Sequence, residues 1–329
     1  MSELETVLVT GCAGFIGSHT TVSLLDSGYR VLGLDNLNDY YSPDRKQANL
    51  AEIRQETAHP ERFDFLQADL RDKERIRQIF QDHRVDRVVH LAAMAGVRNS
   101  IEDPALYIDV NLNATLYLLD AARDHKVRNF VFASTSSVYG ATRTIPFVET
   151  DPCDRPLSPY PATKRAAEML GYSYHHLYGL NFTVLRFFTV YGPRGRPDMM
   201  AHRVLDNIYF GRKTPLFRGG DMHRDWTAVS DIVAGVVSAT GRELGYAIIN
   251  LGRGKPIRVS EFVKVMEKQA GKKATLVDAP MMDADMSYTY ADISRARELL
   301  GYEPAVGIEE GVARFHEWYR ATVLASRAV

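Results

Sequence analysis

The sequence predicts an α/β protein with a doubly wound parallel sheet and a smaller, mixed C-terminal lobe. In the first half, short apolar segments without polar alternation are each followed by a helical segment, as in a parallel sheet covered on both faces. A glycine-rich turn at Gly11–Gly17 joins the first apolar segment to the first helix. The 329 residues are enough to bury a large core, in one big domain or two closely joined ones.

Each element follows from its local pattern. Gly28 ends the first helix, Asp103-Pro104 has the pattern of an N-cap followed by proline at the first helical position, and Pro161 is tolerated in a first turn. Strands are expected at residues 6–10, 30–35, 63–68, 87–91, 129–134 and 181–186, and helices at 15–27, about 45–55, 73–83, 104 to about 126 and 160 to about 178.

The strand and helix alternation ends after Arg186. We therefore predict a dinucleotide-binding domain over residues 1–186, to which 226–252 return, and a substrate lobe made of 187–225 and 253–329. The returning segment contains a helix at 230–242 with Ser230 as N-cap, and a strand at 247–251. The lobe ends in a helix at 308–322, and a cleft between the two parts is where a substrate would lie.

Composition narrows the possible functions. A formal net charge of −1 gives no electrostatic case for a nucleic-acid partner or an anionic membrane surface, and no apolar segment approaches the roughly 20 residues of a membrane helix. Cys12 and Cys153 cannot form a disulfide framework, and no metal-ligand spacing surrounds them. The acidic start, Met1–Glu5, does not resemble a signal peptide. These observations predict a cytoplasmic protein without a metal site.

The turn at Gly11–Gly17 has the spacing G-x-x-G-x-x-G, with Gly11, Gly14 and Gly17. Glycines let a pyrophosphate approach backbone N–H groups at a helix N-terminus. Asp35 ends the second strand, where a carboxylate accepts a ribose 2′-hydroxyl and repels a 2′-phosphate, which favours NAD over NADP. The alternative is that the glycines only shape a turn. Other expected cofactor contacts are Phe15, Ile16, Asn36, Asp69, Leu70, Leu91, Ala92 and Ala93. His90 is expected to be buried and without a chemical role.

Tyr160 and Lys164 stand four residues apart on an expected helix, so their side chains leave the same face. A lysine charge beside a tyrosine favours the phenolate and can make it a usable base. The fifth strand ends in hydroxyl residues, among them Thr135, Ser136 and Ser137. Since carboxyl ends of parallel strands line the ligand crevice, Thr135 is expected beside Tyr160. The alternative is that these hydroxyls only cap the following segment.

These motifs together resemble the extended short-chain dehydrogenase/reductase family, and within it the nucleotide-sugar epimerases. They are T-G-x-x-G-x-x-G at 10–17, D-N at 35–36, H-L-A-A at 90–93, the Ser/Thr strand end, Y-x-x-x-K at 160–164, R-F-F-T-V-Y-G-P at 186–193 and R-D-W at 224–226. Residues 35–41 and 188–199 resemble UDP-glucuronate 4-epimerases, and the segment Ala95–Arg98 agrees with this.

The resemblance implies a Rossmann NAD-binding domain and an isomerase that converts UDP-glucuronate to UDP-galacturonate through a transient 4-keto sugar. Tyr160 would remove the C4 hydroxyl proton as hydride passes to NAD⁺. Lys164 would hold the nicotinamide ribose and lower the pKa of the tyrosine, and Thr135 would bridge the C4 oxygen and the phenol. The family also implies a homodimer, formed by the helices at 105–123 and 160–178.

Substrate contacts follow from the same resemblance. Arg196, with Ser136 and Ser137, would hold the uronate carboxylate and keep the β-keto acid from losing CO₂. Arg224, Arg203 and Thr189 match diphosphate-binding positions, and Arg98 and Asp285 complete the expected set. One departure is Met282-Asp283-Ala284-Asp285, where relatives often have Arg or Gln followed by Pro-Gly-Asp. A donor to the nucleotide is therefore missing at this place.

Other functions stay open at this point. UDP-xylose synthase, a decarboxylase, uses the same Tyr/Lys/Thr set, and UDP-galactose 4-epimerase shares the fold. A 4,6-dehydratase is disfavoured because an Asp-Glu pair is replaced here by Ser136-Ser137. A non-catalytic NAD sensor would use the same fold but has no need of Tyr160, Lys164 and Thr135.

Overall fold

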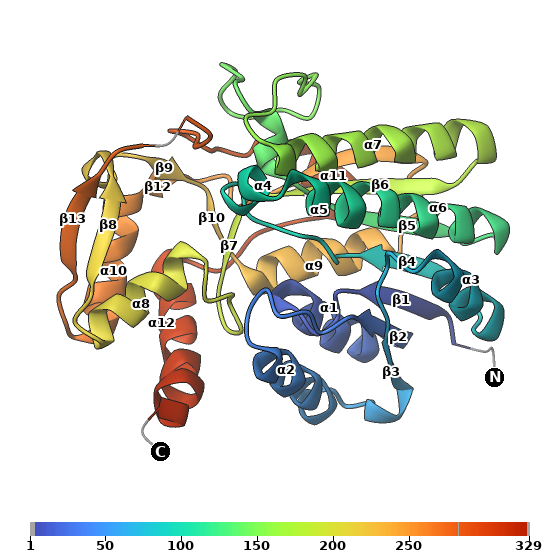
Figure 1. The fold of residues 1–329 in the computed structure, drawn as a ribbon, viewed down its shortest axis with the longest axis horizontal. Coiled ribbons are helices and arrows are strands. Elements are labelled where there is room, and N and C mark those ends of the chain that lie inside the picture. Colours follow the sequence, from blue (N-terminus) through green and yellow to red (C-terminus); the bar gives the residue numbers. More distant parts are fainter. Residues whose placement is uncertain (1–3, 282, 328–329) are drawn as a thin grey trace.

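The computed structural model describes residues 4–281 and 283–327. A seven-stranded parallel sheet in the order β11-β6-β5-β4-β1-β2-β3 forms its centre (Figure 1). Its strands are β1 (Thr6–Thr10), β2 (Arg30–Asp35), β3 (Phe63–Gln67), β4 (Arg87–His90), β5 (Asn129–Thr135), β6 (Asn181–Phe187) and β11 (Tyr246–Leu251). The strand order reverses between β1 and β4, which opens a crevice at their carboxyl ends. The predicted doubly wound fold class is confirmed.

Helices cover both faces of this sheet (Figure 1). One layer contains α1 (Phe15–Asp26), α2 (Pro43–Glu56) and α9 (Val229–Thr240), with α11 (Ser294–Leu300) packed beside α9. The other contains α3 (Lys73–Asp82), α5 (Pro104–Ile108), α6 (Ala114–Asp124) and α7 (Pro159–Tyr178), and the short α4 (Asn99–Glu102) contacts α5 and α7.

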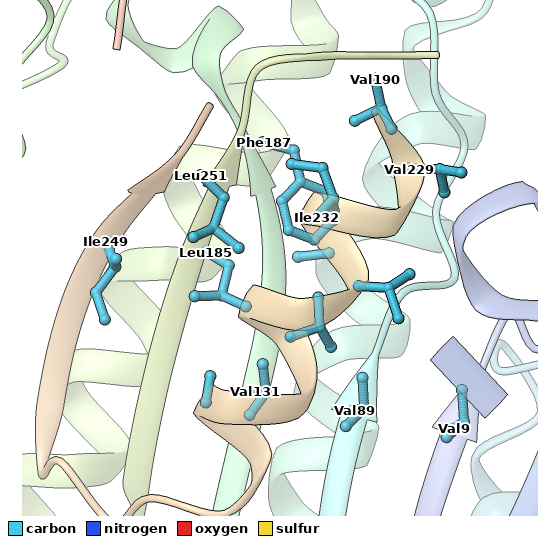
Figure 2. Close-up of a cluster of buried hydrophobic side chains, with 14 of the residues drawn as sticks. Val9, Val89, Val131, Leu185, Phe187, Val190, Val229, Ile232, Ile249 and Leu251 are labelled. Carbon is cyan, nitrogen blue, oxygen red and sulfur yellow. The ribbon is translucent and has the colours of Figure 1, made fainter. Parts of the chain in front are cut away.

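Helix α9 packs directly on the sheet, although it is far from α1 and α2 of the same layer in the sequence. Figure 2 shows Val9, Val89, Val131, Leu185 and Ile249, from five strands, in one layer with α9 residues. All five side chains are almost completely buried. Burying one such side chain stabilises the fold by about 1.5–3 kcal/mol. The segment that carries α9 and β11 is therefore part of the main core.

The smaller lobe contains α8 (Met200–Tyr209), α10 (Val259–Ala270) and α12 (Ile308–Tyr319), at the left of Figure 1. Three strand pairs accompany them. They are β8 (Lys213–Phe217) with β13 (Thr275–Ala279), β7 (Thr189–Tyr191) with β10 (Trp226–Ala228), and β9 (His223–Arg224) with β12 (Ile257–Arg258). The rings of Trp226 and Phe262 stack at 3.9 Å in its core. This lobe thus has an apolar core of its own.

Three helix boundaries differ from the sequence-based expectation. Helix α9 begins at Val229 with Ala228 as N-cap, so Ser230 lies inside the first turn and does not cap it. The long helix predicted from residue 104 contains a π turn at Asp109–Asn113 and ends at Asp124. The last α-helix ends at Tyr319 and continues as a π turn. Turn types of this kind depend on packing, which a periodicity argument does not include. The domain limits stay a prediction.

Across residues 4–281 and 283–327, no helix combines the length and the apolarity needed to cross a membrane.

Candidate active site

The glycine turn has the shape that a dinucleotide phosphate requires. Gly11 has φ +72°, and a Cβ on it would lie 2.8 Å from the Ala92 nitrogen. A Cβ on Gly17 would lie 1.9 Å from the Gly11 carbonyl oxygen. Helix α1 starts here with Gly14 as N-cap, without a side-chain cap and without an acidic residue in its first turn. Its first backbone N–H groups are therefore available to an anion.

A cavity of about 520 Å³ lies over this turn, at the carboxyl ends of the strands. Every cofactor-binding residue predicted from the sequence lines it: Gly11, Gly14, Phe15, Ile16, Gly17, Asp35, Asn36, Asp69, Leu70, Leu91, Ala92, Ala93, Tyr160 and Lys164. The glycine cradle, the uncapped helix start and the carboxylate at the end of β2 fit NAD.

Asp35 is buried at the end of β2 and accepts backbone N–H groups from Ala13 (3.2 Å) and Leu37 (2.9 Å). Burial raises the pKa of this carboxyl group, and these two hydrogen bonds lower it in part. Asn36 donates to Asp69, whose pKa falls to about 2 mainly through its hydrogen bond with Arg71. Asp35 therefore presents a carboxylate at the end of β2, where it would repel a 2′-phosphate, whereas the charge of Asp69 is paired with Arg71.

His90 is fully buried, with Nδ1 2.7 Å from the Thr10 hydroxyl and Nε2 2.9 Å from the Thr115 hydroxyl. Both ring nitrogens are occupied, so this histidine is a buried core residue, as predicted. Among the described residues, no three His, Cys, Asp or Glu side chains are arranged to hold a metal ion.

Tyr160 and Lys164 lie on α7 and face the cavity together. Burial raises the pKa of Tyr160 above its ordinary value, whereas a hydrogen bond from Thr135 and the positive charge of Arg196 lower it. Thr135 ends β5. That Lys164 lowers the pKa of the tyrosine stays a prediction.

The ammonium of Lys164 lies 4.2 Å from the centre of the Phe132 ring, and the residue as a whole is 2% exposed. Burial lowers its pKa to about 7, and the negative charge of Glu168 opposes that effect. At neutral pH this lysine is therefore close to the midpoint of its protonation equilibrium.

Arg196 reaches the same cavity from the loop after β7 and forms a two-pronged ion pair with Asp198, at 3.0 and 2.9 Å. Its guanidinium lies 5.8 Å from the Tyr40 ring, and Tyr40 donates to Asp198 at 3.3 Å. Burial opposes the charge of Asp198, but Arg196 keeps its pKa below the usual range. Tyr40 and Asp198 belong to segments singled out by their resemblance, although neither received a role from the sequence.

A second cavity of about 160 Å³ lies between the sheet and the smaller lobe. Its lining includes five of the predicted substrate-binding residues: Ser136, Ser137, Thr189, Arg224 and Asp285. The guanidinium of Arg224 donates to the carbonyl oxygen of His223, and Asp285 forms an ion pair with Arg98 at 3.0 Å. Arg98 also stacks over Phe217, 4.6 Å from the ring centre. This cavity combines several hydroxyl groups with one cation, Arg224, and both kinds of group can donate to an anionic sugar nucleotide.

Three predicted residues do not join these groups. Arg203 is exposed on α8 and lines neither cavity, and Arg98 reaches the second cavity only through its ion pair with Asp285. Arg196 lines the first cavity, whereas Ser136 and Ser137 line the second. Their roles stay predictions. The segment 282–285 differs from the pattern that relatives often have. Met282 lies outside the described residues, and Ala284 and Asp285 line the second cavity.

A doubly wound sheet, a glycine cradle facing Asp35, and a Tyr–Lys–Thr set beside it define an extended short-chain dehydrogenase/reductase. Comparison with known proteins agrees. The chain belongs to the GDP-mannose 4,6 dehydratase family, which it matches over residues 8–315.

A UDP-glucuronate 4-epimerase of Thermodesulfobacterium geofontis is 45% identical over 317 residues, which are 96% of this chain and 96% of that protein. The crystal structure of UDP-glucuronic acid 4-epimerase from Bacillus cereus, in complex with UDP-glucuronic acid and NAD, is 35% identical, with a TM-score of 0.88 over 96% of this chain and 99% of that one. UDP-glucose 4-epimerase of Thermotoga maritima, solved with UDP-glucose, is 32% identical, with a TM-score of 0.87 over 97% and 99%.

Proposed function

We propose that this protein is an isomerase that inverts C4 of UDP-glucuronate to give UDP-galacturonate, through a transient 4-keto sugar, with NAD as its resident cofactor. The single observation that carries this proposal is that Tyr160, Lys164 and Arg196 line the same cavity as the glycine turn and Asp35. Support also comes from a relative and a solved structure that match nearly the whole chain and are UDP-glucuronate 4-epimerases.

Tyr160 supplies the proton transfer in this proposal. Its phenol would accept the proton of the C4 hydroxyl. Burial raises the pKa of this phenol, and Thr135 and Arg196 oppose that effect. The same oxygen returns the proton when C4 is reduced from the other face. NAD⁺, when bound, supplies reversible hydride chemistry at C4, and Gly11, Gly14, Asp35 and Lys164 would hold it.

The uronate carboxylate needs cationic or hydroxyl donors. Ser136 and Ser137 supply hydroxyls in the second cavity, and Arg224 supplies a cation for the diphosphate. Arg196 would add a two-pronged contact, for which it must exchange its pairing with Asp198 for the substrate carboxylate. Holding the carboxylate out of line with the 4-keto group would prevent loss of CO₂.

Incubation of the purified protein with UDP-glucuronate tests this proposal against its alternatives. Epimerisation yields UDP-galacturonate, decarboxylation yields UDP-xylose, and a non-catalytic sensor yields neither. UDP-galactose as a parallel substrate separates a hexose epimerase from a uronate epimerase. Faster turnover of UDP-galactose than of UDP-glucuronate would contradict the assignment.

The role of Arg196 has a separate test. We expect Arg196→Ala to bind UDP-glucuronate more weakly and to release more pentose nucleotide per epimerisation event than the unaltered protein. Lys213→Ala, at the start of β8, is a control because it removes a cation that lines neither cavity. If Arg196→Ala kept its affinity and formed no additional pentose nucleotide, Arg196 would not be the carboxylate ligand.

The finer expectations about assembly belong to the same proposal. Helix α7 exposes Met169 (59%), Tyr172 (52%) and Leu177 (65%), and α5 exposes Ile108 (45%). The helices α5 and α7 lie beside each other (Figure 1). These apolar side chains would be covered in a homodimer that pairs the helices predicted for this role, at 105–123 (α5 and α6) and 160–178 (α7), of two copies. Light scattering of the purified protein measures its mass, and a monomer would contradict the dimer. Two free cysteines, both buried, are in keeping with a reducing cytoplasm.

A further inference from the structure

Helix α7 carries a completely buried carboxylate, Glu168, one helical turn after Lys164. Glu168 accepts hydrogen bonds from the Ser134 hydroxyl at 2.5 Å and from Nε and Nη2 of Arg186 at 3.1 and 2.8 Å. Arg165 adds a fourth contact at 3.0 Å. A buried charge with this many donors is costly to move, because each donor would be left without its partner.

The partners of Glu168 are on two neighbouring strands. Ser134 is the residue before Thr135 on β5, and Arg186 stands directly opposite Ser134 on β6. Arg186 is itself fully buried, with its guanidinium 4.8 Å from the Tyr139 ring centre. Burial opposes its charge, but Glu168 keeps the pKa of Arg186 above the ordinary value. Glu168 therefore ties α7 to the carboxyl ends of β5 and β6, one residue before Thr135.

The same carboxylate is the anion that acts on Lys164. The other groups around this ammonium are neutral or cationic. Tyr160 shares its helix, Phe132 of β5 presents a ring face, and His90 of β4 is neutral because burial lowers its pKa well below the usual range. Arg186 of β6 lies behind Glu168. Without Glu168, the charge on Lys164 would face an apolar wall and a second cation.

We propose that Glu168 is a positioning residue: its contacts with Ser134 and Arg186 hold the part of α7 that carries Tyr160 and Lys164 against the ends of β5 and β6, and its negative charge stabilises the Lys164 ammonium one helical turn away. The part that concerns turnover depends on the proposed function. The part that concerns Lys164 does not, because it can be measured without substrate.

The direct test is a pH titration of the full-length chain labelled with ¹³C at the lysine ε-carbons, with and without saturating NAD. Lys164→Arg assigns the Lys164 signal by its disappearance. We expect Glu168→Gln to lower the midpoint of Lys164 by about one pH unit. Glu267→Gln is the matched control, since it removes a buried carboxylate paired with Lys273 in the smaller lobe, and it should leave the midpoint unchanged.

Glu168→Gln leaves Arg186 buried without its partner, which can prevent folding. A second comparison avoids this. Arg186→Met and the double variant Glu168→Gln/Arg186→Met both lack the buried cation, and we expect the midpoint of Lys164 to be lower in the double variant by about one pH unit. An unchanged midpoint in both comparisons would overturn the proposal.

Turnover supplies the second readout. At a pH between the two midpoints, Glu168→Gln should lose kcat with little change in KM for the sugar nucleotide, and acidification should restore part of the loss. A loss that is equal at every pH would mean that Glu168 acts only through folding, and it would overturn the electrostatic role. Absence of epimerase activity in the unaltered protein would instead refute the proposed function and leave the titration result standing.

Discussion

Replacement of Lys164 by methionine should stabilise the protein without cofactor, and more so at neutral than at alkaline pH. Burial lowers the pKa of Lys164 from 10.5 to about 7. Between these pH values the unfolded chain holds more protons than the folded chain, so stability rises with pH across that window. The cost of the buried ammonium is complete below pH 7 and disappears above pH 10.5.

The size of this effect follows from the same two values. A pKa difference of about 3.5 corresponds to at most about 5 kcal/mol, because each pKa unit is worth about 1.4 kcal/mol. Between pH 9.5 and pH 7 the cost grows by about 3 kcal/mol. Methionine has a similar length and keeps an apolar contact with Phe132, so little packing is lost.

Urea unfolding of both proteins at pH 7 and pH 9.5 measures the effect as a change in the free energy of unfolding. We expect the advantage of Lys164→Met over the unaltered protein to be larger at pH 7 than at pH 9.5. Lys268→Met, which changes an exposed lysine on α10, should show no such difference between the two pH values. An advantage that is the same at both would refute the buried-charge argument.

Two further predictions concern the cofactor cavity. Gly17→Ala should weaken NAD binding at least about tenfold, because its Cβ would lie 1.9 Å from the Gly11 carbonyl oxygen and displace the turn. Gly307→Ala is the control, because its Cβ has nothing within 4 Å. If calorimetry gave Gly17→Ala the same NAD affinity as the unaltered protein, the role of the glycine turn in binding would be contradicted. Asp35→Ser should raise the ratio of NADP affinity to NAD affinity, because it removes the buried carboxylate at the end of β2. Fluorescence titration with both cofactors measures this ratio, and an unchanged ratio would disprove the prediction.

The fold and the cofactor cavity were predictable because their determinants are local in sequence. The glycine turn, Asp35 and the pair Tyr160–Lys164 each depend on a few neighbouring residues and on the rule that strand ends meet at one edge of a parallel sheet. The structure brings the predicted cofactor residues around one cavity without exception.

The parts that the sequence missed depend on contacts between distant segments. The pairing of Arg196 with Asp198 depends on the conformation of one loop, and their neighbour Tyr40 lies 158 residues before Asp198. Arg203 matched a motif position, yet the rotation of α8 leaves it exposed. Glu168 follows Lys164 on an amphipathic helix, where a charged residue is usually solvated; only the location of Arg186 and Ser134 on adjoining strands explains its burial.

The central claim is that the phenol of Tyr160 moves the proton of the reacting hydroxyl. Its most direct test is the turnover of UDP-glucuronate by Tyr160→Phe, with NAD affinity measured on the same preparation. We predict that kcat falls by about 10²–10⁴-fold while NAD binding stays nearly unchanged. A phenylalanine variant that interconverts the two uronates as fast as the unaltered protein would contradict the claim.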